Sequence, residues 1–287
     1  MSALASYAAV VFAGGGSRCF WQAGFWHAVD PELAHPPRVV TATSAGASTA
    51  CHVFGGQTSQ CLAFYRAAAQ DKHRNIQPEN LFKGGPVFPG HQTYRRALET
   101  VLAGEGLARL RQGRPQIRVL MTRPPAWSGP GLGGWLGVLA YSLEKRLVNP
   151  VHPRWTWRLG FTPLVGRIDQ CASVGELADL VLAASCLPVV LPPMTWEGAR
   201  VLDGGFLDNA PLAALSPEEG PVLVLLTRRY PPERLQGRPG VTYVMPSRPL
   251  AISKFENSNP DLVEATFQQG VADGEKFLAG GPAALQQ

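Results

Sequence analysis

Three short stretches carry the residue types that acyl-transfer chemistry needs. The first, VVTATSAGAS at residues 39–48, places Ser44 where a predicted strand gives way to a predicted helix. A nucleophilic serine needs such a sharp turn, because the turn lifts its hydroxyl above the strand ends and beside the positive end of a helix. Gly46 matches the last position of a G-x-S-x-G pattern, and Ala42 stands where the first glycine belongs. Taken alone, a serine in this position is more often an ordinary helix cap than a nucleophile.

The second stretch is FAGGGSRCFWQAG, residues 12–24, which follows an apolar run. Gly14, Gly15 and Gly16 let backbone N–H groups turn toward a negative charge without side chains in the way. A dinucleotide-binding loop is not indicated, because Cys19 occupies the place of its third glycine, and the loop lacks the G-K-[ST] of a phosphate-binding loop. Two interpretations are left, an oxyanion hole and a plain glycine-rich turn.

The third stretch, RVLDGGFLDNAPL at residues 200–212, places Asp203 after a short predicted strand and before two glycines. A carboxylate at the end of a sheet is a suitable base for a nearby hydroxyl. In isolation, an acid in a turn is the simpler interpretation.

The histidines favour a serine–aspartate dyad over a triad. All six histidines precede Asp203, and the last is His152. In an α/β-hydrolase the order along the chain is serine, acid, histidine, so no such triad is available with Asp203.

Taken together and in this order, the three motifs resemble the patatin-like phospholipase family, whose pattern is G-G-G-x-[RK]-G, then G-x-S-x-G, then D-G-[GA]. Cys19 and Ala42 are the departures from it. The stretches AASCLPVVLPP (183–193) and Asn-Ala-Pro (209–211) are also similar to the family, so the resemblance spans residues 7–212.

The resemblance implies a three-layer α/β/α domain with a largely parallel sheet, in which Asp203 accepts the proton of Ser44 during attack on an ester. It implies an oxyanion hole at Gly14–Gly16 and no cofactor. Arg18 matches the basic position of the first motif and either holds a lipid phosphate or braces the loop. No metal is expected, because the sequence has no acidic calcium loop.

The elements that must position these residues follow from the apolar pattern. Short apolar runs predict strands, and longer periodic stretches predict helices. The predicted strands are residues 8–12, 38–43, 117–122, 200–202, 221–227 and 241–245, and the predicted helices are residues 22–30, 45–54, 60–70, 93–103, 177–184 and 261–278. This alternation indicates an α/β fold with a largely parallel sheet, and we expect a single domain over 1–287 with C-terminal strands and a helix at 221–280.

Residues 122–162 break the pattern as a Gly/Pro/Trp-rich insertion. Tryptophan mixed with arginine and a short apolar run is typical of a lipid–water interface or an active-site lid. The alternative is an insertion packed on the sheet with tryptophan as ordinary core. Trp135 is the residue of this segment that we expect at the substrate.

Composition limits the functional classes. With 45% apolar and 16% charged residues the chain is globular, and five unpatterned cysteines indicate reduced thiols. The net charge of +5 comes from scattered residues, so we expect no nucleic-acid partner. The start of the chain lacks a basic leader pattern, and we expect a cytoplasmic protein with peripheral membrane contact as an option.

We therefore expect a phospholipase A or lysophospholipase acting on membrane or micellar lipid. The alternatives are a soluble esterase, thioesterase or acyltransferase that uses the same dyad, and a non-catalytic lipid-binding module. Head-group preference, positional preference and oligomeric state are left open by the sequence.

Overall fold

The computed structural model describes residues 7–33, 35–70, 90–188, 191–235, 238–256 and 258–285. Eight strands in these residues form one sheet in the order β5-β6-β3-β2-β1-β7-β8, with β4 also paired to β3. The strands are β1 (Ala9–Phe12), β2 (Val39–Ala42), β3 (Gln116–Arg123), β4 (Thr162–Arg167), β5 (Met194–Trp196), β6 (Ala199–Asp203), β7 (Val222–Leu225) and β8 (Val241–Val244).

The centre of the sheet is parallel, because β3, β2, β1, β7 and β8 all pair in that sense. The strands β4, β5 and β6 add antiparallel pairs at one edge. Strands β1, β2 and β7 are buried along their whole length, as continuous apolar runs in parallel sheets are.

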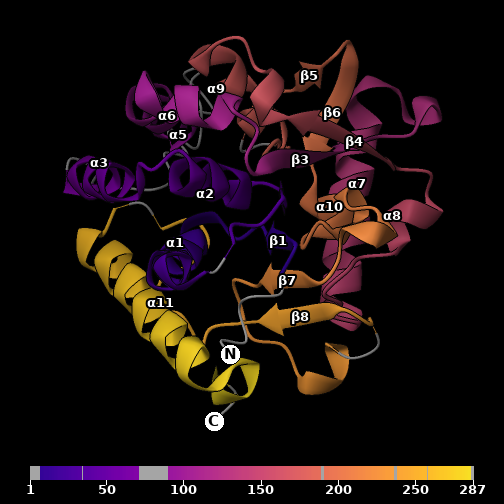
Figure 1. The fold of residues 1–287 in the computed structure, drawn as a ribbon. Coiled ribbons are helices and arrows are strands. Elements are labelled where there is room, and N and C mark those ends of the chain that lie inside the picture. The colour runs from indigo at the N-terminus through magenta and orange to yellow at the C-terminus, as the bar shows by residue number, and fades with distance from the viewer. Residues whose placement is uncertain are drawn as a thin grey trace.

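Helices cover both faces of the sheet, as Figure 1 shows. One face carries α1 (Cys19–Val29), α2 (Ala45–Phe54), α3 (Thr58–Gln70), α5 (Gly90–Val101), α6 (Glu105–Arg111), α9 (Val174–Ala183) and α11 (Pro260–Gly280), and the other carries α7 (Gly129–Leu147), α8 (Trp155–Arg158) and α10 (Gly205–Asp208). The largest buried apolar cluster joins α1, α2 and α9 to the sheet, and a smaller cluster around Phe161, Leu202 and Phe206 packs under α7. The three-layer α/β/α prediction is confirmed.

The predicted insertion at 122–162 is more regular than its composition indicates. Its first residues end β3, and the rest forms the 19-residue helix α7, then α8, before the chain returns as β4 beside β3. Glycine and proline lower helix propensity, which hid α7 in the sequence. Here the glycines permit close packing: a Cβ on Gly137 would lie 3.3 Å from the ring of Phe161, and one on Gly134 would lie 3.1 Å from Pro188.

Candidate active site

Ser44 occupies the turn between β2 and α2, at the carboxyl edge of the parallel strands. Its backbone has φ 53° and ψ −140°, which is a strained conformation for a residue other than glycine. Thr43 anchors the turn, because its hydroxyl donates to the carbonyl of Leu120 on β3 over 3.0 Å. The conformation is that of a nucleophile turn, and the sequence motif predicted the same residue.

Gly46 has a packing reason that the motif alone does not give. A Cβ at this position would lie 2.5 Å from the carbonyl oxygen of Phe12 and 2.7 Å from that of Ala13. The first turn of α2 therefore lies directly against the end of β1. Ala42, by contrast, is fully buried within β2, and its methyl group fits where the pattern has glycine.

Asp203 reaches the same edge from the opposite direction. It is the last residue of β6, which runs antiparallel to β3 and pairs Asp203 with Met121. The hydroxyl of Thr122 donates to its carbonyl over 2.9 Å, and the amide of Gly205 donates to its carboxylate over 2.8 Å. Both Asp203 and Ser44 are buried, with 4% and 7% of their surface exposed.

Burial raises the pKa of Asp203 above its usual range. The charge of Lys254, a side-chain hydrogen bond with Ser44 and the amide of Gly205 oppose this rise in pKa without cancelling it. A carboxylate with a raised pKa is a stronger proton acceptor than an exposed one, and the same hydrogen bond places it within reach of the Ser44 hydroxyl.

One carbonyl oxygen links the backbone at Ser44 to the backbone directly after Asp203. The carbonyl of Ala184, directly after α9, accepts the amide of Ser44 over 3.2 Å and the amide of Gly204 over 3.3 Å. A Cβ on Gly204 would collide with the carbonyl of Leu120 and the hydroxyl of Thr43, so glycine is required there. The structure thus brings together Ser44 and Asp203, which the sequence separates by 159 positions.

The glycine loop lies beside Ser44 and is held by two polar side chains. The carbonyl of Gly14 accepts from the amide group of Asn209 over 3.1 Å and from the hydroxyl of Thr227 over 3.0 Å. A Cβ on Gly14 would lie 3.2 Å from the Cβ of Ser44. Because a trans peptide directs its C=O and the next N–H to opposite sides, fixing the Gly14 carbonyl also fixes the direction of the Gly15 N–H.

The three glycines differ in what their amides do. The Gly14 amide donates to the carbonyl of Asn209 over 2.9 Å, whereas the amides of Gly15 and Gly16 donate to no backbone carbonyl within the described residues. Gly16 has φ 60°, and a Cβ there would collide with the carbonyl of Lys254. The Gly15 amide also hydrogen-bonds the thiol of Cys19, which opposes the rise in the pKa of that thiol caused by burial, and Gly14 shapes the loop.

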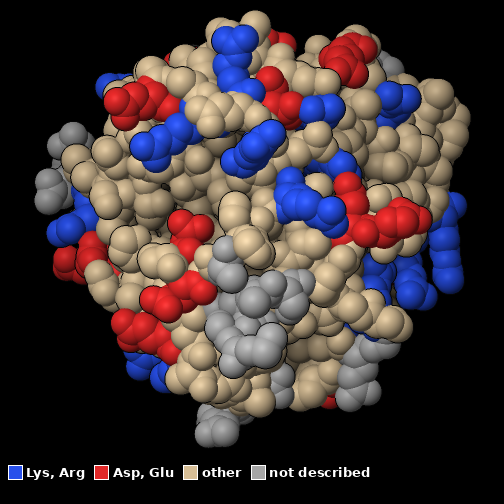
Figure 2. Space-filling model, in the orientation of Figure 1, with Lys and Arg blue, Asp and Glu red and all other residues tan. Residues whose placement is uncertain are grey.

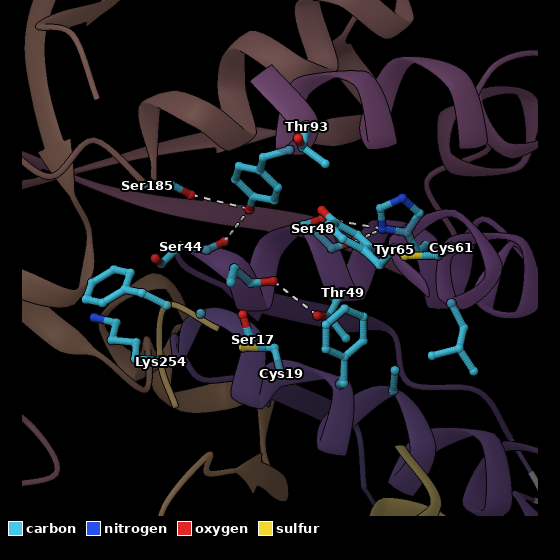
Figure 3. A pocket seen from close by; sticks show the side chains of 18 of the residues that line it. Ser17, Cys19, Ser44, Ser48, Thr49, Cys61, Tyr65, Thr93, Ser185 and Lys254 are labelled. Atoms are coloured by element: carbon cyan, nitrogen blue, oxygen red, sulfur yellow. Dashed lines mark hydrogen bonds between the residues drawn. The ribbon is translucent and has the colours of Figure 1, made fainter. Parts of the chain in front are cut away.

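A cavity of about 170 Å³ opens beside Ser44 and runs between the helices of one face. In Figure 3, Ser44, Ser185 and Lys254 lie at one end, and Cys61 and Tyr65 lie at the other. Apolar side chains line most of it, including Phe20, Ala23, Val53, Leu62, Leu187, Leu191, Phe255 and Phe267. A narrow apolar cavity that begins at a serine suits an alkyl chain.

Arg18 and Trp135 lie outside this cavity. The Nε of Arg18 donates to the carbonyl of Ile252 over 3.4 Å, which favours the bracing role over the phosphate-binding role. Trp135 stands on the outer face of α7 with 59% of its surface exposed, so it is not a pocket residue. Cys19, which replaces a glycine of the family pattern, begins α1 with a buried side chain that lines the cavity.

Histidines near the motifs have other roles. His52 lines the cavity, but its Nδ1 lies 2.8 Å from the carbonyl of Ser48, and burial lowers its pKa to about 4. His152 contacts the carboxylate of Asp208 at 2.6 Å and the hydroxyl of Tyr243 at 2.9 Å. His73 lies outside the described residues.

Three contributors to the site were missed in the sequence, namely Thr227, Lys254 and the carbonyl of Ala184. Asn209 was noticed only as part of the Asn-Ala-Pro stretch, and its contacts with Gly14 now give that stretch a physical meaning. Within the described residues, no group of three or more His, Cys, Asp or Glu side chains is arranged to hold a metal ion. None of the helices that the structure describes is long and apolar enough to cross a bilayer.

Comparisons with known proteins identify one family. No curated protein matches the sequence. Among solved structures, the crystal structure of VipD from Legionella pneumophila is similar, with a TM-score of 0.48, 12% sequence identity, and alignment over 96% of this chain and 67% of that one. The family model for patatin-like phospholipases matches residues 10–216, which include the glycine loop, Ser44 and Asp203. This match covers more than half of the sequence and confirms the resemblance, so the chain belongs to the patatin-like phospholipase family, whose activity is lipid acyl hydrolysis.

Proposed function

We propose that this protein cleaves carboxylic ester bonds of phospholipids, as a phospholipase A or lysophospholipase, through Ser44 and Asp203. The observation that carries the proposal is the position of a buried serine–aspartate pair at one end of an apolar cavity. The cavity takes the acyl chain, and the ester lies at Ser44.

The chemistry divides into two steps. Asp203 accepts the proton of the Ser44 hydroxyl while Oγ attacks the ester carbonyl carbon, and the developing oxyanion is stabilised by the amides of Gly15 and Gly16. The tetrahedral intermediate then releases the alcohol portion of the lipid, which takes the proton back from Asp203. A water molecule hydrolyses the acyl-enzyme in the same manner, so the free fatty acid leaves and Ser44 regains its proton.

The test compares wild type with Ser44→Ala and Asp203→Asn on mixed phospholipid vesicles and on p-nitrophenyl butyrate. We expect both variants to lose at least about a thousandfold in kcat, as when one member of a nucleophile–base unit is removed. Circular dichroism and thermal melting verify that the variants are folded. Labelling by a fluorophosphonate, followed by peptide mass spectrometry, is expected to mark Ser44.

Each alternative has its own outcome. Turnover of the short ester alone identifies a soluble esterase, and transfer of the acyl group to an added alcohol identifies an acyltransferase. An inert wild type that still binds vesicles identifies a non-catalytic lipid-binding module. A Ser44→Ala variant with unchanged turnover contradicts the proposal directly.

A further inference from the structure

The outer face of α7 carries large apolar side chains that nothing in the described residues covers. Leu132, Trp135, Leu139, Leu143 and Leu147 follow one another at intervals of three or four residues, which places them on one side of the helix. Their exposed fractions are 60%, 59%, 58%, 42% and 70%, and Trp127, just before the helix, is 66% exposed.

An ordinary surface helix turns its large apolar side chains toward the core, whereas the inner face of α7 carries several small residues. Gly133, Gly137 and Ala140 are buried against the protein, and the ring of Tyr141 packs edge-on against Phe206 with 5.6 Å between centroids. Small residues thus share the inner face with Leu136, Val138 and Tyr141, and the five large apolar residues of the stripe face outward. This arrangement holds α7 close to the protein and gives its apolar stripe no role in the core.

The charges of the segment that carries the stripe are almost all positive. From Arg123 to Phe161 the only acid is Glu144, which is buried and accepts the amides of Arg154 and Trp155. The exposed cations of this segment are Arg123, Arg146, Arg154 and Arg158. On the face of the molecule seen in Figure 2, by comparison, acidic and basic side chains are interspersed.

The apolar layer beneath α7 is connected to the cavity. Leu136 of α7 belongs to the same apolar cluster as Leu187, and Leu187 lines the cavity beside Ser44. Leu187 therefore joins the apolar layer beneath α7 to the lining of the cavity.

We propose that the outer face of α7 is the docking surface of this protein for an anionic lipid–water interface, in which α7 lies parallel to the membrane plane. An apolar stripe flanked by tryptophan and arginine without exposed acids is complementary to lipid tails beneath anionic head groups. The choice of partner rests on the proposed function, because a lipid hydrolase must meet its substrate at such an interface.

The test is flotation of the full chain with vesicles of phosphatidylcholine alone and of phosphatidylcholine with 30% phosphatidylglycerol. Wild type is expected to float with the anionic vesicles and to bind them less in 0.5 M salt. The double variant Leu132→Ser/Leu139→Ser is expected to bind at least about tenfold more weakly, since two exposed leucines no longer enter the apolar layer. Arg146→Glu is expected to weaken binding to the anionic vesicles and to leave binding to the phosphatidylcholine vesicles unchanged.

The matched control is Arg111→Glu, which makes the same charge change on α6, across the sheet from α7. It is expected to float like wild type. The Leu132→Ser/Leu139→Ser variant is also expected to keep its melting temperature and its turnover of p-nitrophenyl butyrate, which needs no lipid surface.

Two outcomes overturn the inference. One is flotation of the leucine double variant equal to that of wild type. The other is a wild-type dimer in sedimentation that the double substitution dissociates while flotation is unchanged, because the stripe then serves a second copy of the chain. If wild type hydrolyses neither the phospholipids nor p-nitrophenyl butyrate, the proposed function is overturned, and the flotation result still stands.

Discussion

At the scale of single residues, the turn at Ser44 depends on Gly46, whose nearest neighbours are backbone atoms. The atoms that a Cβ on Gly46 would meet belong to Phe12 and Ala13, at the end of the strand that leads into the glycine loop. Backbone atoms at the end of a central strand do not move aside as a flexible side chain does. A larger residue at position 46 therefore displaces the turn and the loop together.

We predict that Gly46→Ala lowers kcat/KM by at least about a hundredfold, because misplaced oxyanion donors alone cost this much. The matched change is Ala42→Gly, which restores the glycine of the family pattern. It is expected to leave kcat/KM within about threefold and to lower stability by roughly 1 kcal/mol, because glycine in a strand costs conformational entropy. Steady-state kinetics and urea unfolding measure both effects, and an active Gly46→Ala variant contradicts the packing argument.

Lys254 contributes to the site in two separable ways. Its carbonyl accepts the amide of Ser17 over 3.0 Å and lies against Gly16, and any residue at this position supplies that carbonyl. Its ammonium group lowers the pKa of Asp203 against the larger effect of burial. Only the second contribution is lost when the side chain is changed.

We predict that Lys254→Met moves the acid limb of the kcat/KM profile to higher pH. The Asp203 carboxylate must be ionised to accept a proton, and without the nearby cation its pKa rises further, so a higher pH is needed to ionise it. The loss in kcat/KM is therefore greatest at low pH and fades as the pH rises. Lys254→Arg is expected to keep the wild-type limb, and an unshifted limb in Lys254→Met contradicts the role.

The sequence predicted the candidate nucleophile and base but not the groups that hold the glycine loop beside them. Ser44 and Asp203 are each embedded in a short local pattern, which is why the motifs revealed them. Asn209 and Thr227 meet Gly14 from 195 and 213 positions away, and only the paired strands bring them there. Trp135 was expected at the substrate because of its residue type, and its direction on α7 depends on which residues face the core.

At the scale of elements, α1 is held by a helix that lies outside the family match. Helix α11 crosses α1 at three glycines, Gly24, Gly270 and Gly274. A Cβ on Gly24 would collide with the carbonyl of Phe267, and one on Gly270 would collide with the carbonyl of Trp21. The indole of Trp21 also donates to the carboxylate of Asp273 over 2.8 Å. Because α1 begins shortly after the glycine loop, α11 holds in place the helix into which the proposed oxyanion donors lead.

We predict that Gly270→Ala destabilises the protein by roughly 1–3 kcal/mol, as overpacking at a close contact does. The control is Gly175→Ala in α9, where the only neighbour within 4 Å is the hydroxyl oxygen of Ser173 at 3.7 Å. That change is expected to be neutral or stabilising by up to about 1 kcal/mol, since alanine favours helix. Equal destabilisation by the two substitutions in chemical unfolding contradicts the close crossing.

Most elements were predictable because their patterns are local. Residues 45–54 form the predicted helix, and the six predicted strands differ from the observed ones only at their ends, whereas β4 and β5 were not predicted. Helix α7 was not predicted, because five glycines and a proline hide its propensity and its apolar face points away from the core. The structure of α7 is decided by tertiary packing, and a single sequence does not report tertiary packing.

At the scale of the whole molecule, the sheet is complete only with segments beyond the family match. That match ends at residue 216, yet β7 pairs with β1 along its whole length and lies between β1 and β8. Without it, β1 becomes an edge strand and one face of α1 loses α11. We therefore propose that the C-terminal strands and helix belong to the same cooperative unit, and the single domain over 1–287 stays a prediction.

We predict that a chain ending at residue 216 does not fold cooperatively. It exposes the buried edge of β1 and the apolar surface beneath α11, so it is expected to bind a hydrophobic dye and to show no sharp thermal transition. A chain ending at residue 285, which keeps α11, is the control and is expected to melt like the full chain. A sharp transition in the shorter chain contradicts the single cooperative unit.

The shared acceptor at Ala184 has a consequence for motion. The amides of Ser44 and Gly204 bind the same oxygen, and Gly204 directly follows Asp203. The segment that follows α9 therefore supports the proposed nucleophile and the proposed base together. We expect a small shift of that segment to move Ser44 and Asp203 together, so that the distance over which the proton is transferred does not change. We therefore expect the spacing between Ser44 and Asp203 to vary less than the positions of the helices around the cavity.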